Sequence, residues 1–514
     1  MRNLFAVLGL FVTALTAACG SSSHPKVAPD GGGMSRGAVK GDGAAEVGGR
    51  GGATGTGGTM GTGGAAGSDA LVATGGVAGS DGPTAQGGTK IIDGPVASGG
   101  VEARDAPVGT GGGGARGTGG TTGAGGASGI AAPADNVAEV SVDFGLPNIG
   151  YLNGLFATVT VCVPGTGQCQ TIDHVLVDTG SSGLRLLGSV LTLSLPAWTD
   201  DSGVALAQCT EFVSSFTWGP LRGADLKIAG EQASNIAIQV IDESTYPVPS
   251  DCTGTSTDTA ETLRSNGIIG VGSLAQDCGT ACAQPLGTRS ANPGLYYACS
   301  STKKGGCQAT AVPVSKQVSH PVMLFSEDNN GTIIELPTVP ANGATSVTGA
   351  LVFGIGTRDN NGLGQATVLP LDNAGTFLTK YPANGNSSMA FVDTGSNAIY
   401  FLDSRTTQIP ACTGMYSFLY CPSSTQSLSA TNQDANGLVT ITVNFSIANA
   451  KTLFTRVADV VFGNLGGPSV TPSSPGTGMG AYFDWGLPFY FGRNVFTSIE
   501  GQSTPVGTEL FVAF

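Results

Sequence analysis

Two stretches of the chain, VLVDTGSS at residues 175–182 and MAFVDTGSN at residues 389–397, share the tetrapeptide Asp-Thr-Gly-Ser. In both, a short apolar run typical of a buried strand passes directly into a turn, because glycine permits a tight change of direction. Each stretch therefore places one aspartate, Asp178 or Asp393, at the corner between a strand and a turn. A single copy is typical of a turn capped by the aspartate side chain. Two copies in like settings indicate two related halves that each contribute one carboxylate.

Two carboxylates brought face to face change each other's protonation. If the halves pack about a pseudo-twofold axis, charges about 4 Å apart repel by about 4 kcal/mol at an effective dielectric near 20. This repulsion corresponds to roughly three pKa units, so we expect the pair to hold one proton over a wide acidic range. A carboxylate and a carboxylic acid on either side of one water act as base and acid. This arrangement can hydrolyse a peptide bond without a metal ion or a covalent intermediate.

The chain after residue 135 has the composition of an all-β protein. It is rich in Val, Thr, Phe and Gly, and its apolar runs are short and interrupted by turn signals. Two of these signals are the DNNG strings that begin at Asp328 and Asp359. Both strings lack the Glu that completes a calcium-binding loop, so we predict hairpin turns there rather than calcium sites.

Several longer strings resemble the pepsin-like aspartic peptidases over most of residues 137–514. The opening hairpin and first catalytic loop of that family are matched by YLNGLFATVTVCVPG and QTIDHVLVDTGSSGLRLL. The segments that cross behind the two loops are matched by NGIIGVG (266–272) and LPFYFGRNVFTSIEG (487–501). The flap hairpin over the dyad is matched by FTWGPLRGADLKIAG (216–230). The strings GSSGLRLL, TWGP and FDWGLPFYFGRNVF also resemble an uncharacterised bacterial family, recorded as a domain of unknown function. That second resemblance implies the fold and no established activity.

The resemblance to pepsin-like peptidases implies a bilobal double β-barrel with pseudo-twofold symmetry and a central active-site cleft. Its N-terminal lobe would span residues 136–325 and its C-terminal lobe residues 326–514. Asp178 and Asp393 would form the catalytic pair. The supporting residues implied are Thr179 and Thr394, which would cross-brace the two loops, Ser181 and Ser396, which would bond the outer carboxylate oxygens, and the turn glycines Gly180 and Gly395.

Two positions depart from the pepsin-like pattern. Where that family has a Leu-Trp pair after the first loop, this chain has Leu184 and Arg185, and the Tyr of the flap is best matched by Trp218, between Phe216 and Gly219. An indole only donates hydrogen bonds, whereas a tyrosine also accepts them. Either Arg185 lies under the indole in a cation–π contact, or Trp218 packs in the core and Arg185 is solvated. These departures leave two functions open: an aspartic endopeptidase, or a catalytically inactive scaffold that binds a peptide or a cell-envelope component.

The first 135 residues are expected to be a targeting region and a tether. Residues 1–18 resemble a signal peptide, with a basic start and an apolar run too short to span a bilayer permanently. Cys19 follows small residues and resembles the lipidation site of a bacterial lipoprotein, and the alternative is ordinary cleavage after Ala18. Residues 20–135 hold 39 of the 83 glycines and predict a disordered linker. By resemblance we expect an exported lipoprotein of the bacterial outer membrane, facing the periplasm or the cell surface.

The chain has eleven cysteines, and ten remain when Cys19 is set aside. An even number in an exported protein predicts disulfides. The pairing by nearest neighbours is Cys162 with Cys169, Cys278 with Cys282, Cys299 with Cys307, Cys412 with Cys421, and Cys209 with Cys252. A zinc site at Cys278 and Cys282 is the competing interpretation, but no second pair of ligands follows at a suitable spacing.

Composition and motifs exclude several other classes of protein. A net charge of −14 with 22 basic residues argues against binding to nucleic acid or to anionic lipid. The three histidines do not accompany a G-x-S-x-G elbow, so a serine hydrolase is a poor fit. We expect a monomer without a cofactor or a bound metal ion, which acts on a peptide or protein and reaches the membrane through its lipid anchor only.

Overall fold

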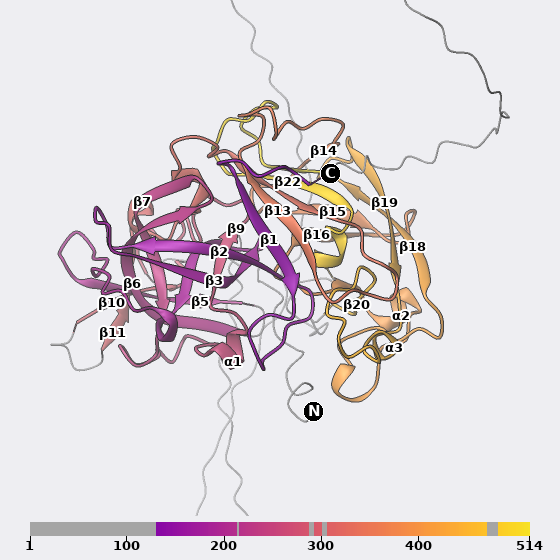
Figure 1. Cartoon of the computed structure of the whole chain (residues 1–514), viewed down its shortest axis with the longest axis horizontal. Helices are drawn as coiled ribbons and strands as arrows, with labels where there is room; N and C mark the ends of the chain where they lie inside the picture. Colours follow the sequence, from indigo (N-terminus) through magenta and orange to yellow (C-terminus); the bar gives the residue numbers. More distant parts are fainter. Residues whose placement is uncertain (1–129, 213–214, 287–291, 301–305, 470–481) are drawn as a thin grey trace, which may run out of the picture. The chain divides into compact units, whose positions relative to one another are not determined.

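A computed structural model describes residues 130–212, 215–286, 292–300, 306–469 and 482–514 (Figure 1). In these ranges the chain is built from strands, and its α-helices α1 (Ala260–Leu263), α2 (Ser404–Thr407) and α3 (Ala450–Leu453) have four residues each. The prediction of an all-β fold is therefore confirmed. The predicted signal peptide, Cys19 and nearly all of the linker lie outside the described residues. No helix in the described part of the chain has the length and apolar character needed to cross a membrane.

The strands form two sheets. In the first half of the chain they are β1 (Val137–Asp143), β2 (Gly154–Cys162), β3 (Cys169–Asp178), β4 (Ser182–Leu187), β5 (Ala205–Glu211), β6 (Ser215–Ile228), β7 (Glu231–Ile241), β8 (Thr255–Ser256), β9 (Gly267–Val271), β10 (Tyr296–Cys299) and β11 (Cys307–Ala309). In the second half they are β12 (Gly331–Leu336), β13 (Val347–Phe353), β14 (Val368–Pro370), β15 (Phe377–Lys380), β16 (Ser387–Asp393), β17 (Ile399–Phe401), β18 (Gln426–Gln433), β19 (Thr440–Ile447), β20 (Gly466–Gly467), β21 (Phe483–Gly486), β22 (Arg493–Ser498) and β23 (Phe511–Ala513). The larger sheet has the order β11-β10-β5-β6-β7-β4-β9-β3-β2-β1-β13-β12-β22-β23-β14, with β8 beside β6, and the smaller sheet has the order β19-β18-β15-β16-β21-β17-β20.

The same strand unit occurs once in each half. In the first, β3 pairs antiparallel with β2 and parallel with β9, and β9 pairs antiparallel with β4. In the second, β16 pairs antiparallel with β15 and parallel with β21, and β21 pairs antiparallel with β17. The two units agree in register, because Asp178 lies opposite Gly270 and Asp393 opposite Gly486. The predicted pair of related halves is therefore present, in the bilobal arrangement of a pepsin-like fold.

The two register-matched glycines allow each loop to lie directly on its crossing strand. A Cβ at Gly270 would lie 2.7 Å from the backbone of Ser181, and a Cβ at Gly486 would lie 2.1 Å from the carbonyl oxygen of Ala398. The second crossing strand is thus Phe483–Gly486, which ends one residue before the 487–501 segment predicted for this role.

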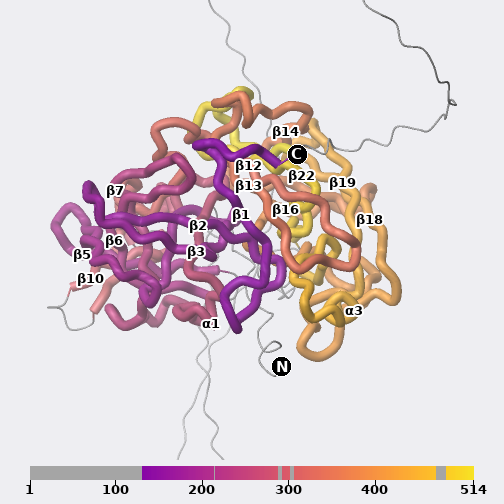
Figure 2. The backbone as a smooth tube through the Cα atoms, viewed as in Figure 1, coloured from indigo at the N-terminus to yellow at the C-terminus, as the bar shows by residue number. Residues whose placement is uncertain are grey.

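The first strand of the chain joins the two halves. β1 lies between β2 and β13, as Figures 1 and 2 show, so the larger sheet is continuous from one half to the other. The chain already makes contacts ahead of this strand, since the amide of Ala131 donates to a Glu335 carboxylate oxygen at 2.6 Å and the amide of Gly230 donates to the carbonyl of Asp135 at 2.7 Å.

The DNNG strings are not hairpin turns, so that prediction was wrong. The first string leads into β12, and the second lies between β13 and β14, which do not pair with each other. Instead, the loops that contain these strings contact one another. Arg358, which precedes the second string, forms an ion pair with Asp328 of the first, and the amide of Arg358 donates to the side chain of Asn361 at 2.8 Å. The second string also forms a local turn, in which the amide of Asn361 donates to the carbonyl of Arg358 at 3.4 Å. That turn and the ion pair between the two loops explain the strings.

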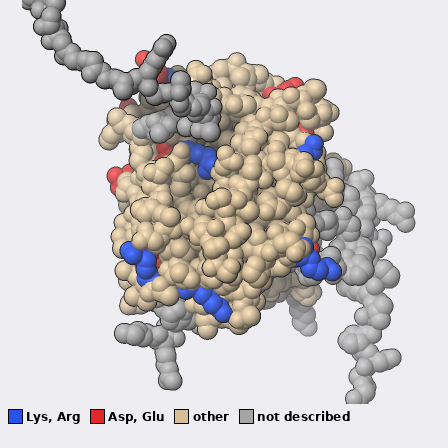
Figure 3. Space-filling model, turned by 90° about the vertical axis from the view of Figure 1, so that its right-hand side faces the viewer, with Lys and Arg blue, Asp and Glu red and all other residues tan. Residues whose placement is uncertain are grey.

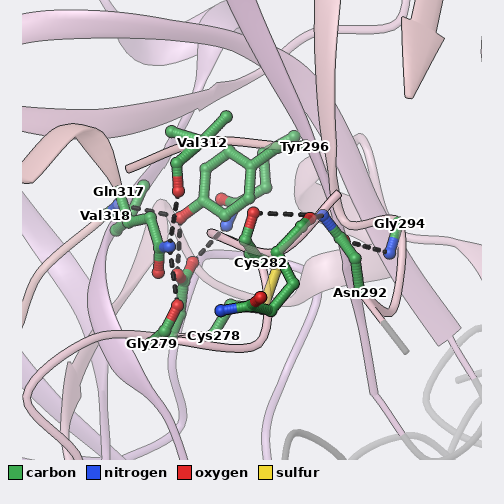
Figure 4. Close-up of a disulfide and its surroundings, with 12 residues drawn as sticks. Cys278, Gly279, Cys282, Asn292, Gly294, Tyr296, Val312, Gln317 and Val318 are labelled. Atoms are coloured by element: carbon green, nitrogen blue, oxygen red, sulfur yellow. Dashed lines mark hydrogen bonds between the residues drawn. A yellow bond between two sulfur atoms is a disulfide. The ribbon is translucent and has the colours of Figure 1, made fainter. Parts of the chain in front are cut away.

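All five predicted disulfides are present: Cys162–Cys169, Cys209–Cys252, Cys278–Cys282, Cys299–Cys307 and Cys412–Cys421. The zinc alternative at Cys278 and Cys282 is thereby excluded. Figure 4 shows how hydrogen bonds hold the loop of this short disulfide, with Gln317 donating to the carbonyl of Gly279 at 2.8 Å and Asn292 donating to the carbonyl of Cys282 at 3.0 Å. The loop begins beside Asp277, which enters the site described below.

Candidate active site

Each Asp-Thr-Gly-Ser loop holds its aspartate in the same way. Asp178 ends β3 and accepts hydrogen bonds from the amide of Gly180 at 2.8 Å and from the hydroxyl of Ser181 at 2.5 Å. Asp393 ends β16 and accepts the equivalent bonds from the amide of Gly395 at 2.8 Å and the hydroxyl of Ser396 at 2.9 Å. Each loop therefore directs one backbone donor and one hydroxyl donor at its own carboxyl.

The threonines of the two loops brace one another. The amide of Thr179 donates to the hydroxyl of Thr394 at 3.1 Å, and the amide of Thr394 donates to the hydroxyl of Thr179 at 3.0 Å. The hydroxyl of Thr394 also donates to the carbonyl of Val177 at 2.7 Å. The hydroxyl of Thr179 lies 2.9 Å from that of Tyr490, so the brace carries an additional partner on one side.

The two aspartates lie together and out of water. A Cβ placed on Gly395 would lie 2.7 Å from Asp178 Oδ1 and 3.0 Å from Asp393 Oδ1. The two carboxyl oxygens therefore lie close together, beside Gly395. Both residues are buried. Burial, followed by the charge of Asp393, raises the pKa of Asp178 from its ordinary value of 3.8 to about 8. A pair held in this way keeps one proton when most carboxyls are ionised.

Further ionisable groups surround this pair, and sequence reasoning missed them. Asp484 on β21 is fully buried, and its Oδ2 lies 2.6 Å from the hydroxyl of Ser396. The phenols of Tyr490 and Tyr151 lie near enough to the aspartates that the aspartate charges raise the pKa of both phenols, in addition to the larger effect of burial. The signal for Asp484 was its position in FDWG, where an acid interrupts an apolar strand, because acids are almost never fully buried unless paired.

Arg185 lies beneath the first loop. It neither contacts the Trp218 indole nor faces solvent, so both predicted settings for it are wrong. It is fully buried, and its guanidinium forms an ion pair with Asp277 at 3.2 Å and donates to the carbonyl of Ser182 at 2.9 Å. Asp277 also accepts a hydrogen bond from the hydroxyl of Tyr296 at 2.5 Å and one from the amide of Gln208. Burial raises the pKa of Asp277, and the Arg185 charge opposes this rise. Arg185 therefore fixes the base of the loop rather than facing an indole or solvent.

Trp218 packs in the body of the first half. It is fully buried, meets the ring of Tyr297 edge-on at 5.1 Å, and donates from its indole nitrogen to the carbonyl of Tyr246 at 2.9 Å. Phe216 is buried beside it, and a Cβ on Gly219 would lie 1.9 Å from the carbonyl oxygen of Val240, so β7 crosses closely there. These residues are not at the tip of a flap.

The hairpin of β5 and β6 turns between Glu211 and Ser215, before the residues expected to form the flap. Cys209 lies opposite Trp218 and Glu211 opposite Phe216, so Trp218 stands in the paired part of the hairpin and not at its end. Phe212, which follows Glu211, lines the cleft beside the first loop. The predicted place of Trp218 at the tip of a flap is therefore wrong.

A cavity of about 270 Å³ adjoins the first loop. The first half contributes residues 179–182 together with Phe212 and Leu274, and the second half contributes Phe391, Val392 and Gly375. Most of its lining is apolar, with the loop hydroxyls and the buried Arg185–Asp277 pair at one side. A cleft of this composition suits a ligand with apolar groups and a few polar groups that fix its orientation.

Metal-ligating clusters and the distribution of surface charge are two further features that bear on the site. In the described ranges no group of three or more His, Cys, Asp or Glu side chains is arranged to hold a metal ion. On the face shown in Figure 3, lysines, arginines and acids are scattered among uncharged residues. The described residues of the site supply the carboxyl pair and its hydroxyl donors.

Comparison with known proteins places the chain in a family. A family model described as "Protein of unknown function (DUF3443)" matches residues 132–514. Among solved structures, that of an aspartic proteinase from Irpex lacteus is similar to this chain at 14% sequence identity, with a TM-score of 0.43 and coverage of 73% of this chain and 96% of that chain. No curated protein matches the sequence. Because the family model spans most of the chain, this protein belongs to the DUF3443 family.

Proposed function

We propose that this protein is an aspartic endopeptidase that hydrolyses peptide bonds with a water molecule activated by Asp178 and Asp393. The observation that carries the proposal is the convergence of the two buried carboxyls, each held by an amide and a hydroxyl of its own loop. Two acids that repel each other are costly to bury together, and a binding role alone would not require them.

The pair supplies the acid and the base that the reaction needs. The two carboxyls share one proton, so one of them acts as the acid and the other as the base; we assign the acid to Asp178 and the base to Asp393. Asp393 accepts a proton from water as the water oxygen attacks the peptide carbonyl carbon, and Asp178 donates its proton to the carbonyl oxygen. Collapse of the tetrahedral intermediate breaks the C–N bond. The proton held by Asp393 passes to the departing amine, and one hydroxyl of the intermediate returns its proton to Asp178, which leaves a carboxylic acid and restores the singly protonated pair.

The substrate we propose is an extended peptide lying across the cleft. Apolar side chains of such a peptide would contact Phe212, Leu274 and Phe391, while its backbone would pair with edge groups as an added strand does. The apolar part of the cleft lining favours recognition by apolar side chains and backbone over recognition by charge.

We further propose that the protein is exported and anchored through a lipid on Cys19. The support is the N-terminal sequence together with five disulfides, which form and persist in oxidising compartments.

The test is cleavage of a mixed peptide library by the purified mature protein between about pH 3 and pH 8, with and without a pepstatin-type inhibitor. Asp173→Asn is the matched control, since Asp173 lies on the same strand as Asp178 with its side chain exposed. We expect wild type and the control to cleave at acidic pH and the inhibitor to abolish cleavage. Absence of cleavage by a folded wild type at every pH would contradict the proposal and favour the inactive peptide-binding scaffold.

A further inference from the structure

A third carboxyl lies behind the second catalytic loop and has no counterpart behind the first. Asp484 stands two residues before Gly486, the residue that faces Asp393. The equivalent residue in the first half, two before Gly270, is Ile268, which is also fully buried. The pseudo-twofold symmetry is therefore broken at this position by one acid. Among the described residues at the two matched positions, an additional carboxyl lies beside Asp393 and an isoleucine lies beside Asp178.

Asp484 is connected to Asp393 through a single hydroxyl. The oxygen of Ser396 lies 2.9 Å from Asp393 Oδ2 and 2.6 Å from Asp484 Oδ2. A serine hydroxyl has one hydrogen, so both contacts are hydrogen bonds only when one of the two carboxyls carries a proton. Either Asp484 is neutral and donates to Ser396, which then donates to Asp393, or the chain of donors runs in the opposite direction.

The surroundings of Asp484 favour its neutral form. The charged groups that act on it are Asp393 and Asp178, both acids, and the other titratable side chains facing it are the phenols of Tyr400 and Tyr490. Its second oxygen, Oδ1, is buried and accepts no hydrogen bond from the described residues. An ionised carboxylate in that position would lack compensation for its lost hydration. Burial is the main cause that raises the pKa of Asp484 well above its ordinary value.

We propose that Asp484 is a positioning residue of the proposed peptidase. While Asp484 is protonated, it donates to Ser396, and the Ser396 hydroxyl donates to Asp393. When Asp484 ionises, the Ser396 hydroxyl donates to Asp484 instead. The inference rests on the proposed function of the dyad. While Asp484 is neutral, Asp393 keeps its hydroxyl donor and serves as the base. When Asp484 loses its proton, Ser396 donates to Asp484 at 2.6 Å, and Asp393 loses one of its two loop donors. The ionisation of Asp484 thereby lowers the peptidase activity on the alkaline side of the pH profile.

Asp484→Asn tests this role in the full mature chain, because an amide of the same size donates to Ser396 at every pH and cannot ionise. We expect the acid limb of the kcat/KM profile to stay in place and the alkaline limb to move upward by about one pH unit, which is about a tenfold gain of activity on that limb. Asp484→Ile, the residue of the other half, should move the same limb. In a Ser396→Ala background, Asp484→Asn should move the limb by clearly less than in wild type, because only the charge interaction with the dyad remains.

A residue with a merely structural role would lower activity at all pH values without moving the alkaline limb, and that result would overturn the proposal. A second measurement needs no activity. Carbon-13 labelling of aspartate carboxyls should show by NMR one more protonated aspartate at neutral pH in wild type than in Asp484→Asn, with Asp173→Asn as control. Equal numbers in wild type and Asp484→Asn would refute the role of Asp484. The expected NMR difference in an inactive wild type would instead count against the proposed peptidase alone.

Discussion

The hydroxyl of Thr179 accepts a hydrogen bond from the amide of Thr394 at 3.0 Å, and the hydroxyl of Thr394 accepts one from the amide of Thr179 at 3.1 Å. Each loop is thus held by the other, so the separation of the two carboxyls is set by contacts across the two halves of the chain. The relative position of the two loops therefore depends on both threonines.

Replacing Thr394 by Val is expected to weaken both the fold and the proposed activity. The substitution keeps the size of the side chain but leaves the amide of Thr179 and the carbonyl of Val177 without their partner. Each buried unsatisfied group costs about 1–3 kcal/mol, so the free energy of unfolding should fall by about that amount or more. Chemical denaturation measures the loss. Thr394→Ser restores the hydroxyl and should remain close to wild type, and an equal loss in both variants would contradict the brace.

Replacing Arg185 by Leu is expected to destabilise the protein strongly. Asp277 would keep its bonds from Tyr296 and Gln208 but lose its cation in a fully buried place. Removing one partner of a buried ion pair costs about 3–5 kcal/mol. Thermal unfolding of Arg185→Leu should therefore show a large drop, which Arg185→Leu combined with Asp277→Asn should partly recover. Arg405→Ala, at an exposed residue, is the control. A small effect of Arg185→Leu would show that the ion pair does not support the loop.

Asp178→Asn is expected to stabilise the fold above about pH 4. The folded pKa of Asp178 is about 8 and its ordinary value is 3.8, so below pH 4 both states carry the proton and the group has no effect. As the pH rises toward 8 the unfolded chain ionises first, and the stability of wild type falls. The Asn variant lacks this loss and should gain at least about 1 kcal/mol at pH 7, a few degrees in Tm. A gain of equal size at pH 3.5 would contradict the assignment.

Cys19→Ser tests the proposed anchor, because the thiol of Cys19 is the group that would carry the lipid. We expect an exported protein that is unlipidated or unprocessed and no longer partitions into the detergent phase. Phase partitioning and the mass of the mature chain measure the outcome. A Ser variant that still behaves as a lipoprotein of mature size would exclude Cys19 as the anchor.

Local signals in the sequence predicted the two Asp-Thr-Gly-Ser loops and the disulfides. An Asp-Thr-Gly-Ser turn contains its own donors, so the bonds from Gly180 and Ser181 to Asp178 follow from residues two and three positions away. Four of the five disulfides close short loops, and the fifth, Cys209 with Cys252, followed once those were assigned. In each case the bonded residue was either close in sequence or, for Cys209 and Cys252, the one left after the other cysteines had been paired.

The rest of the site depends on contacts between residues that are far apart in the sequence, which local patterns do not predict. Asp277 lies 92 residues from Arg185, and Asp484 lies 88 residues from Ser396. Two long-range features determine where Trp218 lies. One is the register of β5 against β6, and the other is the close approach of Gly219 to the backbone of Val240. The resemblance placed the flap hairpin at residues 216–230, but nearly all of these residues form the single strand β6, which pairs with β5 before it.

The most direct measurement of the central claim is kcat/KM for peptide cleavage by wild type, Asp178→Asn, Asp393→Asn and the double variant, at the pH of highest wild-type activity. Because the two carboxyls act as one acid–base pair, each single variant should lose nearly all activity. The double variant should be little worse than either single one, since the second substitution removes a group that can no longer act. Circular dichroism should show that all four are folded. Cleavage that survives in either single variant would contradict a mechanism in which Asp178 and Asp393 work together.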